Sequence, residues 1–459
     1  MTKSKVYHTI AVHLPTRQPK RTVRKNLNAD ALIALAREEF SRIKDHRAKN
    51  SQIELTDVMM SALAMFHLKD PSLLAFEKRR QEEPENLHFI YGVGRIPCDS
   101  QMRSALDDIA PNVLRPAFRT VFKHLQRGKA LENMTFLDGH YLISGDGTGY
   151  YSSSKVSSDY CLKKVTRNGE TKYYLQMYAA AIVHPDRKEV VPLYPEMITK
   201  QDGSTKNDCE RNASGRFWDA VREDHPHLKI IALEDGLSSN SPHIRHLQSH
   251  NIRFILGAKE GDHEHLFAHV DKAAERGEVT DLTLEDPENS DIIHCFRFIN
   301  QVPLNASNED LLVNFMEHWE VDKEGNVINR FAWVTDLEIT TDNAMDIMRA
   351  GRSRWRIENE TFNTLKNQGY NLGHNYGLGK KHLSGVFTTL MMLAFLIDQA
   401  CQISCWLYQE ALRNCGSKRD LWEKVRGVFH MFTVDSMETI YRAIAFGYEK
   451  VKLVNPLTD

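Results

Sequence analysis

The spacing of apolar residues changes near residue 135 of this 459-residue chain. Before that point apolar side chains recur every three or four residues, as in Leu32, Leu35 and Ala36 and again in Met59 and Leu63. This period places them on one face of an α-helix, and the alternation that is typical of β-strands is scarce. We therefore predict an α-helical N-terminal domain over residues 1–135.

From residue 141 onward the pattern is typical of strands. Three β-rich runs at 141–151, 173–184 and 189–194 are separated by turn residues at Asn168-Gly169 and Pro185-Asp186, which predicts three strands joined by hairpins. The segments that follow are a helix-compatible stretch at 207–223, an aliphatic strand at 228–233, a helix at 241–248 and a strand at 252–256. This order predicts an α/β fold with a mixed sheet flanked by helices.

Residues 262–330 interrupt this pattern with short strand-like pieces at 292–299 and 318–321. Another strand at 331–337 then precedes helical patterns at 342–366 and 383–406. We therefore expect an α/β core that is split by a β-rich insertion. The predicted divisions are a helical domain at 1–135, a first core part at 136–261, the insertion at 262–330, a second core part at 331–412 and a C-terminal region at 413–459 that could mediate dimerisation.

Composition favours a soluble globular protein, with 41% hydrophobic and 26% charged residues. The longest apolar stretch without a charge, 383–397, is shorter than the roughly 18 to 20 residues needed to span a bilayer, so we expect a buried helix and no membrane partner. The seven cysteines contain no Cys-x-x-Cys pair, which argues against a disulfide framework or a zinc ribbon. These features predict a reducing, cytoplasmic environment.

The net charge of −2 hides an uneven distribution. Residues 1–50 carry 12 Lys and Arg but only 4 Asp and Glu, whereas 275–291 is rich in acids. A basic arm of this kind is often a solvated tail, but in front of a helical domain it also suits contacts with phosphates. Arg24 and Lys25 are the residues of the arm that we expect to make such contacts.

Three acids stand where chemistry is expected. Asp146 lies between two glycines in the first predicted strand, Asp235 follows the central aliphatic strand, and Glu358 lies on a late helix with Arg354 one turn before it. Open α/β sheets bind ligands at the carboxyl ends of their strands. If the fold brings the three acids together, they form the all-oxygen ligand set that Mg²⁺ or Mn²⁺ requires.

The segment Arg354-Trp355-Arg356-Ile357-Glu358 resembles the signature of bacterial insertion-sequence transposases of the DDE type, the cut-and-paste group with a Tyr-Arg-Glu-Lys-type signature. The resemblance covers about residues 136–402 and implies an RNase H-like core split by a β-rich insertion. It implies that Asp146, Asp235 and Glu358 are catalytic and hold two Mg²⁺ or Mn²⁺ ions, one generating the attacking hydroxide and the other stabilising the leaving 3′ oxygen.

The same resemblance implies the partners and the reaction. The partners would be double-stranded DNA, as terminal inverted repeats and target, and a second copy of the chain in the DNA complex. The reaction would be cleavage at transposon ends followed by strand transfer. A transposase-derived DNA-binding protein without catalytic activity is the alternative, and a paired-carboxylate glycosidase remains formally possible but would need neither the Arg-Trp-Arg-Ile-Glu segment nor the basic arm.

Two positions depart from the signature. Gly351 stands where the signature has Tyr, and Lys366 lies one residue beyond the signature Lys, which on a regular helix rotates it by about 100°. A second frame that uses Arg356 and Glu360 ranks behind Glu358, because it places an asparagine at the Lys position. Arg354 could hold a phosphate or form an i,i+4 salt bridge with Glu358, and these two roles are compatible.

The strand that re-enters the core carries two aromatic residues, Phe331 and Trp333. In the resembled group a tryptophan in this strand stacks on a base that is flipped out near the transposon end, and counting back from Thr335 places Phe331 there with Trp333 as its neighbour. Such stacking contributes roughly 1 to 3 kcal/mol per base. Burial in the core is the competing, more frequent role for either ring.

Overall fold

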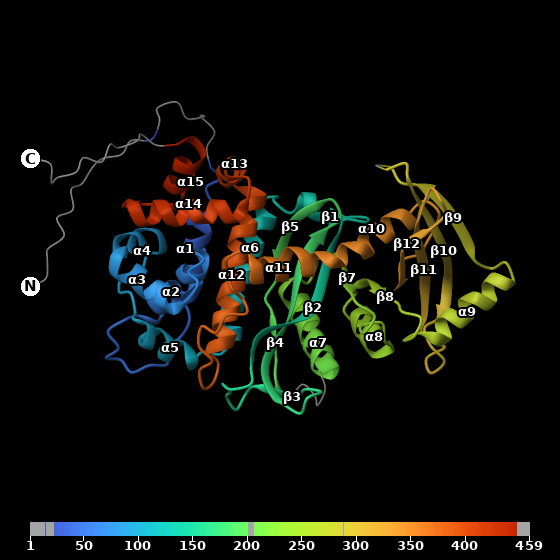
Figure 1. Ribbon diagram of the computed structural model, residues 1–459, viewed down its shortest axis with the longest axis horizontal. Coiled ribbons are helices and arrows are strands. Elements are labelled where there is room, and N and C mark those ends of the chain that lie inside the picture. The colour runs from blue at the N-terminus through green and yellow to red at the C-terminus, as the bar shows by residue number, and fades with distance from the viewer. Residues whose placement is uncertain (1–13, 15–22, 201–205, 288, 448–459) are drawn as a thin grey trace, which may run out of the picture.

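The structure, a computed structural model, describes residue 14 and residues 23–447 apart from 201–205 and 288, and the side chains of 206–209 are not described. Residues 1–13 and 15–22 of the basic arm therefore lie outside the described residues, whereas Arg24 and Lys25 lie within them. Three parts follow one another along the long axis: a helical part, a central sheet with its helices, and an outer β-rich part (Figure 1).

The helical part is built from the segment that the apolar pattern predicted to be helical. Its elements are α1 (Ala29–Ser41), α2 (Leu55–His67), α3 (Leu73–Glu82), α4 (Pro84–Tyr91), α5 (Asp99–Asp107), α6 (Arg115–Arg127) and the short 3₁₀ turns η1 (Pro111–Leu114) and η2 (Glu132–Met134). Side-chain oxygens of Asn28 and Ser72 accept the backbone N–H groups of Ala31 and Ala75 and so cap α1 and α3. Helix α2 is buried along nearly its whole length.

The strands form one 12-stranded mixed sheet. They are β1 (Thr135–Phe136), β2 (His140–Ser153), β3 (Leu162–Val165), β4 (Thr171–His184), β5 (Arg187–Pro192), β6 (Glu196–Ile198), β7 (Ile230–Glu234), β8 (Arg253–Gly257), β9 (Thr280–Glu285), β10 (Ile292–Pro303), β11 (Leu312–Asp322) and β12 (Val327–Thr335). The main order is β3-β4-β2-β7-β8-β12-β11-β10-β9. Strands β2, β7 and β8 run parallel to one another, whereas β4 and β12 pair antiparallel with their neighbours. The predicted α/β class and mixed sheet are confirmed.

The insertion extends the core sheet and does not form a sheet of its own. Strand β12 pairs with β8 over Trp333 to Thr335 and with β11 along most of its length, so one strand belongs to both parts. Helices α7 (Lys206–Asp224) and α8 (Ser241–Ser249) lie beside the core strands, and α9 (Glu264–Glu275) lies beside the outer strands (Figure 1).

The predicted helix over 342–366 is not regular. It consists of α10 (Ala344–Arg352), a 3₁₀ turn η4 (Ser353–Trp355), a π-helical turn η5 (Ile357–Phe362) and α11 (Asn363–Asn367). The apolar spacing predicted a helical segment here correctly, but it does not distinguish α-helical from 3₁₀ or π-helical winding. Their consequence for Lys366 is described below.

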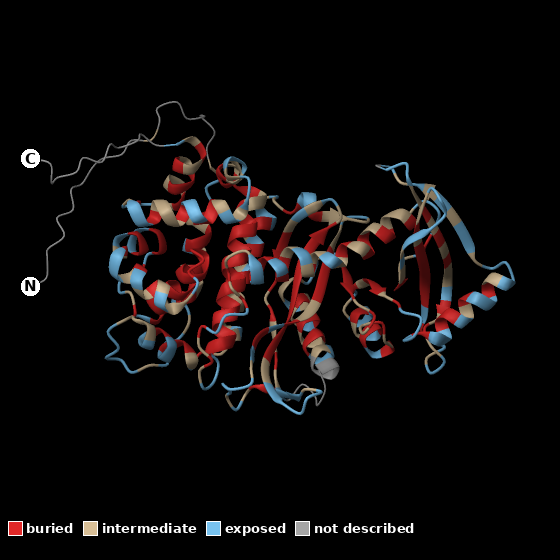
Figure 2. Ribbon diagram, viewed as in Figure 1, coloured by how far each residue is buried: buried red, intermediate tan, exposed pale blue. Residues whose placement is uncertain are grey.

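Helix α12 (Leu383–Ser404) joins the helical part to the sheet. It is long and apolar enough to cross a membrane by length and composition, but 89% of its most apolar window is buried inside the fold. Gln399 of α12 accepts the backbone N–H of Val190 on β5, while Asp398 pairs with Lys69 at the end of α2. The prediction of a buried helix is confirmed, and Figure 2 shows α12 and α2 among the most continuously buried helices.

The C-terminal helices α13 (Trp406–Cys415), α14 (Lys418–Met431) and α15 (Met437–Phe446) pack on the helical part (Figure 1). Asp30 of α1 accepts the backbone N–H groups of Met437 and Glu438 at the start of α15. Asn86 of α4 donates to the carbonyl oxygens of Phe429 and Phe432. The first and last segments of the described chain thus share one core.

Candidate active site

Adjacent parallel strands place two of the predicted acids beside each other. Ser144 of β2 pairs in register with Leu233 of β7. Asp146 lies two residues after Ser144, and Asp235 lies two residues after Leu233. Because parallel strands advance together, both carboxylates emerge at the same edge of the sheet. This is the carboxyl-end position of β7 at which the sequence predicted a site.

The third acid comes from the broken helix that crosses this edge. The Ser144 hydroxyl donates to the carbonyl oxygen of Arg354 at 2.9 Å and so fixes the helix to β2. The Arg354 guanidinium Nη1 lies 3.2 Å from Glu358 Oε1 and 3.8 Å from Asp146 Oδ2. The i,i+4 salt bridge predicted for Arg354 and Glu358 is therefore present, and Arg354 also reaches the acid on β2.

The three acids interact electrostatically, and the balance leaves them short of positive charge. Burial raises the pKa of Asp146 most, and the charges of Asp235 and Glu358 raise it further. The charge of Arg354 and the Gly147 N–H, which donates to Asp146 Oδ1 at 2.7 Å, lower it. The result is a pKa of about 6 for Asp146. One arginine does not compensate for three carboxylates, so a cation at this edge would be stabilised.

The acids do not converge on a single point. Among the described residues, the groups whose ligand atoms all lie within 4.8 Å of one another do not include Asp146, Asp235 and Glu358. One Mg²⁺ with ligand bonds of about 2.0 to 2.1 Å would need oxygens closer than this. Two ions about 3.5 to 4 Å apart would need a more widely spread set of carboxylates. As placed, the three acids therefore do not form a compact single-ion site, and the predicted pair of ions stays a prediction.

The π-helical turn accounts for the displaced lysine. A π-helical turn closes its hydrogen bonds over five residues and so accommodates one residue more than an α-helical turn. Lys366 follows η5 at one residue beyond the signature spacing, and its Nζ donates to Thr148 Oγ1 at 3.1 Å. Thr148 lies on β2 two residues after Asp146, so the lysine reaches the acid edge despite the longer spacing. Its role toward DNA stays a prediction.

Gly351, at the position where the resembled signature has tyrosine, lies against the Trp333 indole. A Cβ atom at Gly351 would lie 2.6 Å from two atoms of the Trp333 indole. The indole therefore occupies the space that a side chain at position 351 would need, and Trp333 is only 6% exposed. Phe331 is half-buried, stacks on Trp333 with ring centroids 5.7 Å apart, and lies under the Arg352 guanidinium. The predicted base-stacking role is sterically more accessible to Phe331 than to Trp333.

The glycines beside Asp146 make room for protein side chains. A Cβ at Gly145 would lie 1.9 Å from the Tyr178 hydroxyl, and one at Gly147 would lie 2.5 Å from Glu210 Oε1. In the structure, Tyr178 fills the first position and a fourth carboxylate fills the second.

Glu234, next to Asp235, was missed by sequence reasoning. It is buried and accepts hydrogen bonds from Tyr178, from Ser214 at 2.9 Å and from His243. Burial raises the pKa of Glu234, but the His243 charge and these three donors outweigh burial and hold it below its usual value. Its partners come from β4, α7 and α8, so no local sequence signal reports this network, which positions the turn that carries Asp235.

The alternative frame with Arg356 and Glu360 faces elsewhere. Arg356 donates to the carbonyl oxygen of Pro185 at 2.6 Å, and its Nη1 lies 3.6 Å from Glu360 Oε1. These contacts direct the pair toward the β4–β5 hairpin. The geometry favours Glu358 over Glu360 as the third acid.

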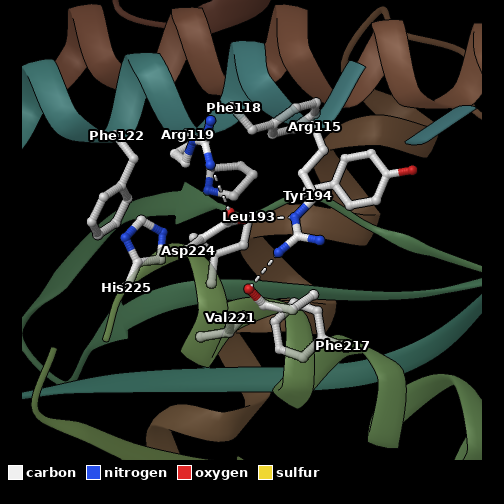
Figure 3. A pocket seen from close by; sticks show the side chains of 12 residues that line it. Arg115, Phe118, Arg119, Phe122, Leu193, Tyr194, Phe217, Val221, Asp224 and His225 are labelled. Carbon is white, nitrogen blue, oxygen red and sulfur yellow. Dashed lines mark hydrogen bonds and ion pairs between the residues drawn. The ribbon is translucent and has the colours of Figure 1, made fainter. Parts of the chain in front are cut away.

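The other predicted contact residues lie in the helical part. Arg24 and Lys25 are exposed, and Arg24 donates to the carbonyl oxygen of Gly128 at the end of α6. A small pocket between α6 and the core is lined by Arg115, Phe118 and Asp224 among others (Figure 3). Arg115 is paired there with Asp224 at 2.7 Å. The pocket contains none of the three acids and is a domain contact.

Three side-chain clusters in the described chain could hold a metal ion by proximity. They are Asp219 with His246 and His250, His294 with His318 and Glu320, and Glu82 with Glu83 and His430. The last two already contain arginine ion pairs, from Arg352 to Glu320 and from Arg79 to Glu83. Only the first of the three is therefore without an arginine counter-charge in the contacts described.

The chain matches no protein-family model, and no curated protein matches it. The arrangement of Asp146, Asp235, Glu358 and Arg354 at one sheet edge is what bears on function.

Proposed function

We propose that this protein is a DNA transposase of the DDE type, with an RNase H-like core, that cleaves DNA at transposon ends and joins the ends to target DNA. The observation that carries the proposal is that Asp146 and Glu358 both lie beside Arg354, while Asp235 at the end of β7 lies near enough to raise the pKa of Asp146. The order of hairpin strands, then alternating helices and strands, then an extension of the sheet supports the predicted split core.

The donor set fits Mg²⁺ or Mn²⁺. All three groups offer carboxylate oxygens, and the raised pKa of Asp146 reflects the missing positive charge. When bound, two such ions would activate a water and stabilise the leaving 3′ oxygen. Asp146, Asp235 and Glu358 would hold them. Because Asp146 must lose its proton to act as a ligand, the affinity for Mg²⁺ should fall as the pH drops below about 6.

The surrounding residues have separate tasks in this proposal. The Ser144 hydroxyl donates to the carbonyl oxygen of Arg354 and so holds this residue beside two of the three acids. The Arg354 guanidinium would bind a DNA phosphate. Lys366, beside Thr148, would bind a second phosphate as a point charge. Phe331, which lies beside Trp333 and under the Arg352 guanidinium, would be the aromatic residue that contacts an unpaired base.

The experiment is cleavage of the DNA that flanks the reading frame. The purified full chain is incubated with labelled flanking fragments in Mg²⁺, in Mn²⁺ and in EDTA, and the ends of the products are mapped. We expect metal-dependent strand cleavage that leaves a 3′ hydroxyl at the boundary of imperfect inverted repeats. The absence of cleavage in both metals, with DNA binding retained, would instead support the DNA-binding protein without catalytic activity.

A further inference from the structure

Two pairs of histidines occur at i,i+4 spacing on helices that flank the sheet. His265 and His269 lie on α9, and no third ligand meets them among the described residues. His246 and His250 lie at the end of α8, and Asp219 of α7 faces both of them. The two pairs look alike in sequence and differ only in what the fold brings to them.

The three ligand atoms at α7 and α8 form a small triangle. Asp219 Oδ1 lies 2.8 Å from His246 Nε2 and 2.7 Å from His250 Nε2, and the two Nε2 atoms are 3.2 Å apart. Ligands around a tetrahedral zinc, bound at about 2.0 to 2.2 Å, lie roughly 3.3 Å from one another. A cation could therefore bind all three atoms after shifts of about half an ångström.

In the hydrogen-bonded cluster, both imidazole Nε2 atoms contact the same oxygen, Asp219 Oδ1. Each imidazole must carry its proton on Nε2 to donate to Asp219, so two N–H groups point at one oxygen while their nitrogens lie 3.2 Å apart. Burial raises the pKa of Asp219, but the hydrogen bonds from both histidines outweigh burial and keep it below its usual value. The carboxylate is thus charged at neutral pH, and one divalent ion would replace both protons.

The position of the cluster leaves room for further ligands. The side chains of His246 and His250 are 28% and 25% exposed, and that of Asp219 is 57% exposed. Solvent can therefore fill a fourth position. The ring of His246 lies over Gly215, one turn before Asp219 on α7, with 3.7 Å between its Cε1 and the position of an added Cβ.

We propose that Asp219, His246 and His250 form a second metal site, selective for Zn²⁺ or a similar borderline transition ion, that links α7 to α8. Two imidazole nitrogens suit Zn²⁺ and disfavour Mg²⁺, which prefers oxygen ligands. The site is therefore chemically distinct from the carboxylate edge. A bound ion would tie together two helices that supply Ser214 and His243 to Glu234, and so would stabilise the turn that carries Asp235.

The test is Zn²⁺ binding by the full chain after removal of metal with EDTA, measured by competition with a chromophoric chelator in excess Mg²⁺. We expect one Zn²⁺ per chain from this site and a rise in the unfolding temperature. In H246A, H250A and D219N the affinity should fall by more than about tenfold, since even the loss of an outer partner of a metal ligand costs about 10- to 100-fold.

The control variant is H265A/H269A, which removes an i,i+4 pair that no third ligand meets in the described part of the chain. It should bind Zn²⁺ as the wild type does. Free thiols such as Cys98 can also bind Zn²⁺, but their share would survive in H246A/H250A. Metal-free unfolding temperatures show whether each variant folds. Unchanged affinity in H246A/H250A, an equal loss in H265A/H269A, or no stoichiometric binding by the wild type would each overturn the proposal, whatever the outcome of the DNA cleavage experiment.

Discussion

Two largely buried carboxylates in different regions of the molecule have pKa values shifted in opposite directions. Asp398, where α12 meets α2, is 3% exposed and is paired with Lys69 and with His67 at 3.1 Å, and Tyr370 donates to it. Burial raises the pKa of Asp398, but the charges of Lys69 and His67 outweigh burial and hold it below its usual value.

At the edge of β7 the balance is reversed. Asp146 has Arg354 at 3.8 Å but also two neighbouring acids, and its pKa rises to about 6. Lys69 and His67 compensate the charge of Asp398. At the β7 edge the negative charge of the three acids exceeds the positive charge of Arg354, so a bound cation would stabilise it. Charge compensation, and not burial, distinguishes the structural acid from the candidate functional acid.

The largest expected effect concerns the cleavage reaction. Asp146→Asn, Asp235→Asn or Glu358→Gln should reduce metal-dependent cleavage at least about 1,000-fold, because each ion supplies several kcal/mol of charge stabilisation. DNA binding, measured by mobility shift, should stay nearly intact. Glu360→Gln is the matched control, since Glu360 pairs with Arg356 away from the edge. Undiminished Mg²⁺-dependent nicking by the first three variants would refute the site.

The next effect concerns the compensated region. Asp398→Asn should destabilise the protein by about 3 kcal/mol, because it leaves the buried ammonium of Lys69 without its counter-charge. Denaturant unfolding followed by circular dichroism measures the change. Asp420→Asn, which weakens an exposed pair with Lys424, serves as the control and should change stability by less than about 1 kcal/mol. If Asp398→Asn were as stable as the wild type, the buried pair of Asp398 with Lys69 would not stabilise the fold, and the comparison with the β7 edge would be wrong.

The same change at the β7 edge should act in the opposite direction. Asp146→Asn should stabilise the metal-free protein by roughly 1 to 3 kcal/mol at pH 7, because it removes a carboxylate whose pKa is raised from 3.8 to about 6. A raised pKa favours the folded state below pH 4, and this contribution is lost as the pH rises through about 6. Unfolding midpoints in EDTA should therefore differ between the two proteins at pH 7 and converge at pH 4.

The smallest effect concerns the exposed charges of the helical part. Arg24→Ala with Lys25→Ala should weaken DNA binding and reduce the slope of log affinity against log salt by about 2, or 0.9 for each phosphate contact. Lys272→Ala with Arg276→Ala removes the same charge from α9. If both double variants have the same slope, the arm has no specific role in DNA binding.

Much of the fold could be predicted because its determinants are local. The hairpin strands, the aliphatic strand before Asp235 and the apolar segment of α12 are each encoded by contiguous residues. The three acids could also be named, because strand ends and a helix with a paired arginine are visible in sequence. Their placement at one edge depends on the parallel pairing of β2 with β7, which the sequence analysis did not predict.

What could not be predicted depends on contacts between distant segments. The π-helical winding of η5 leaves no periodic signal in the sequence, and the contact of Lys366 with Thr148 on β2 shows only in the folded chain. The sequence shows only that Gly351 replaces the signature tyrosine, whereas the structure shows that the Trp333 indole fills the space a side chain at position 351 would need. His246 and His250 could not be told from His265 and His269, because only the fold supplies Asp219.

The contact between Lys69 and Asp398 spans 329 residues, and this has a consequence for how the protein is made. At synthesis rates of about 5 to 20 residues per second, the helices that leave the ribosome first wait roughly 20 to 70 s for the helix that completes their core. During that interval the part of the apolar surface of α2 that packs against α12 stays uncovered. Closing so long a loop also slows folding. The N-terminal helices should therefore be the segment on which a chaperone binds the nascent chain.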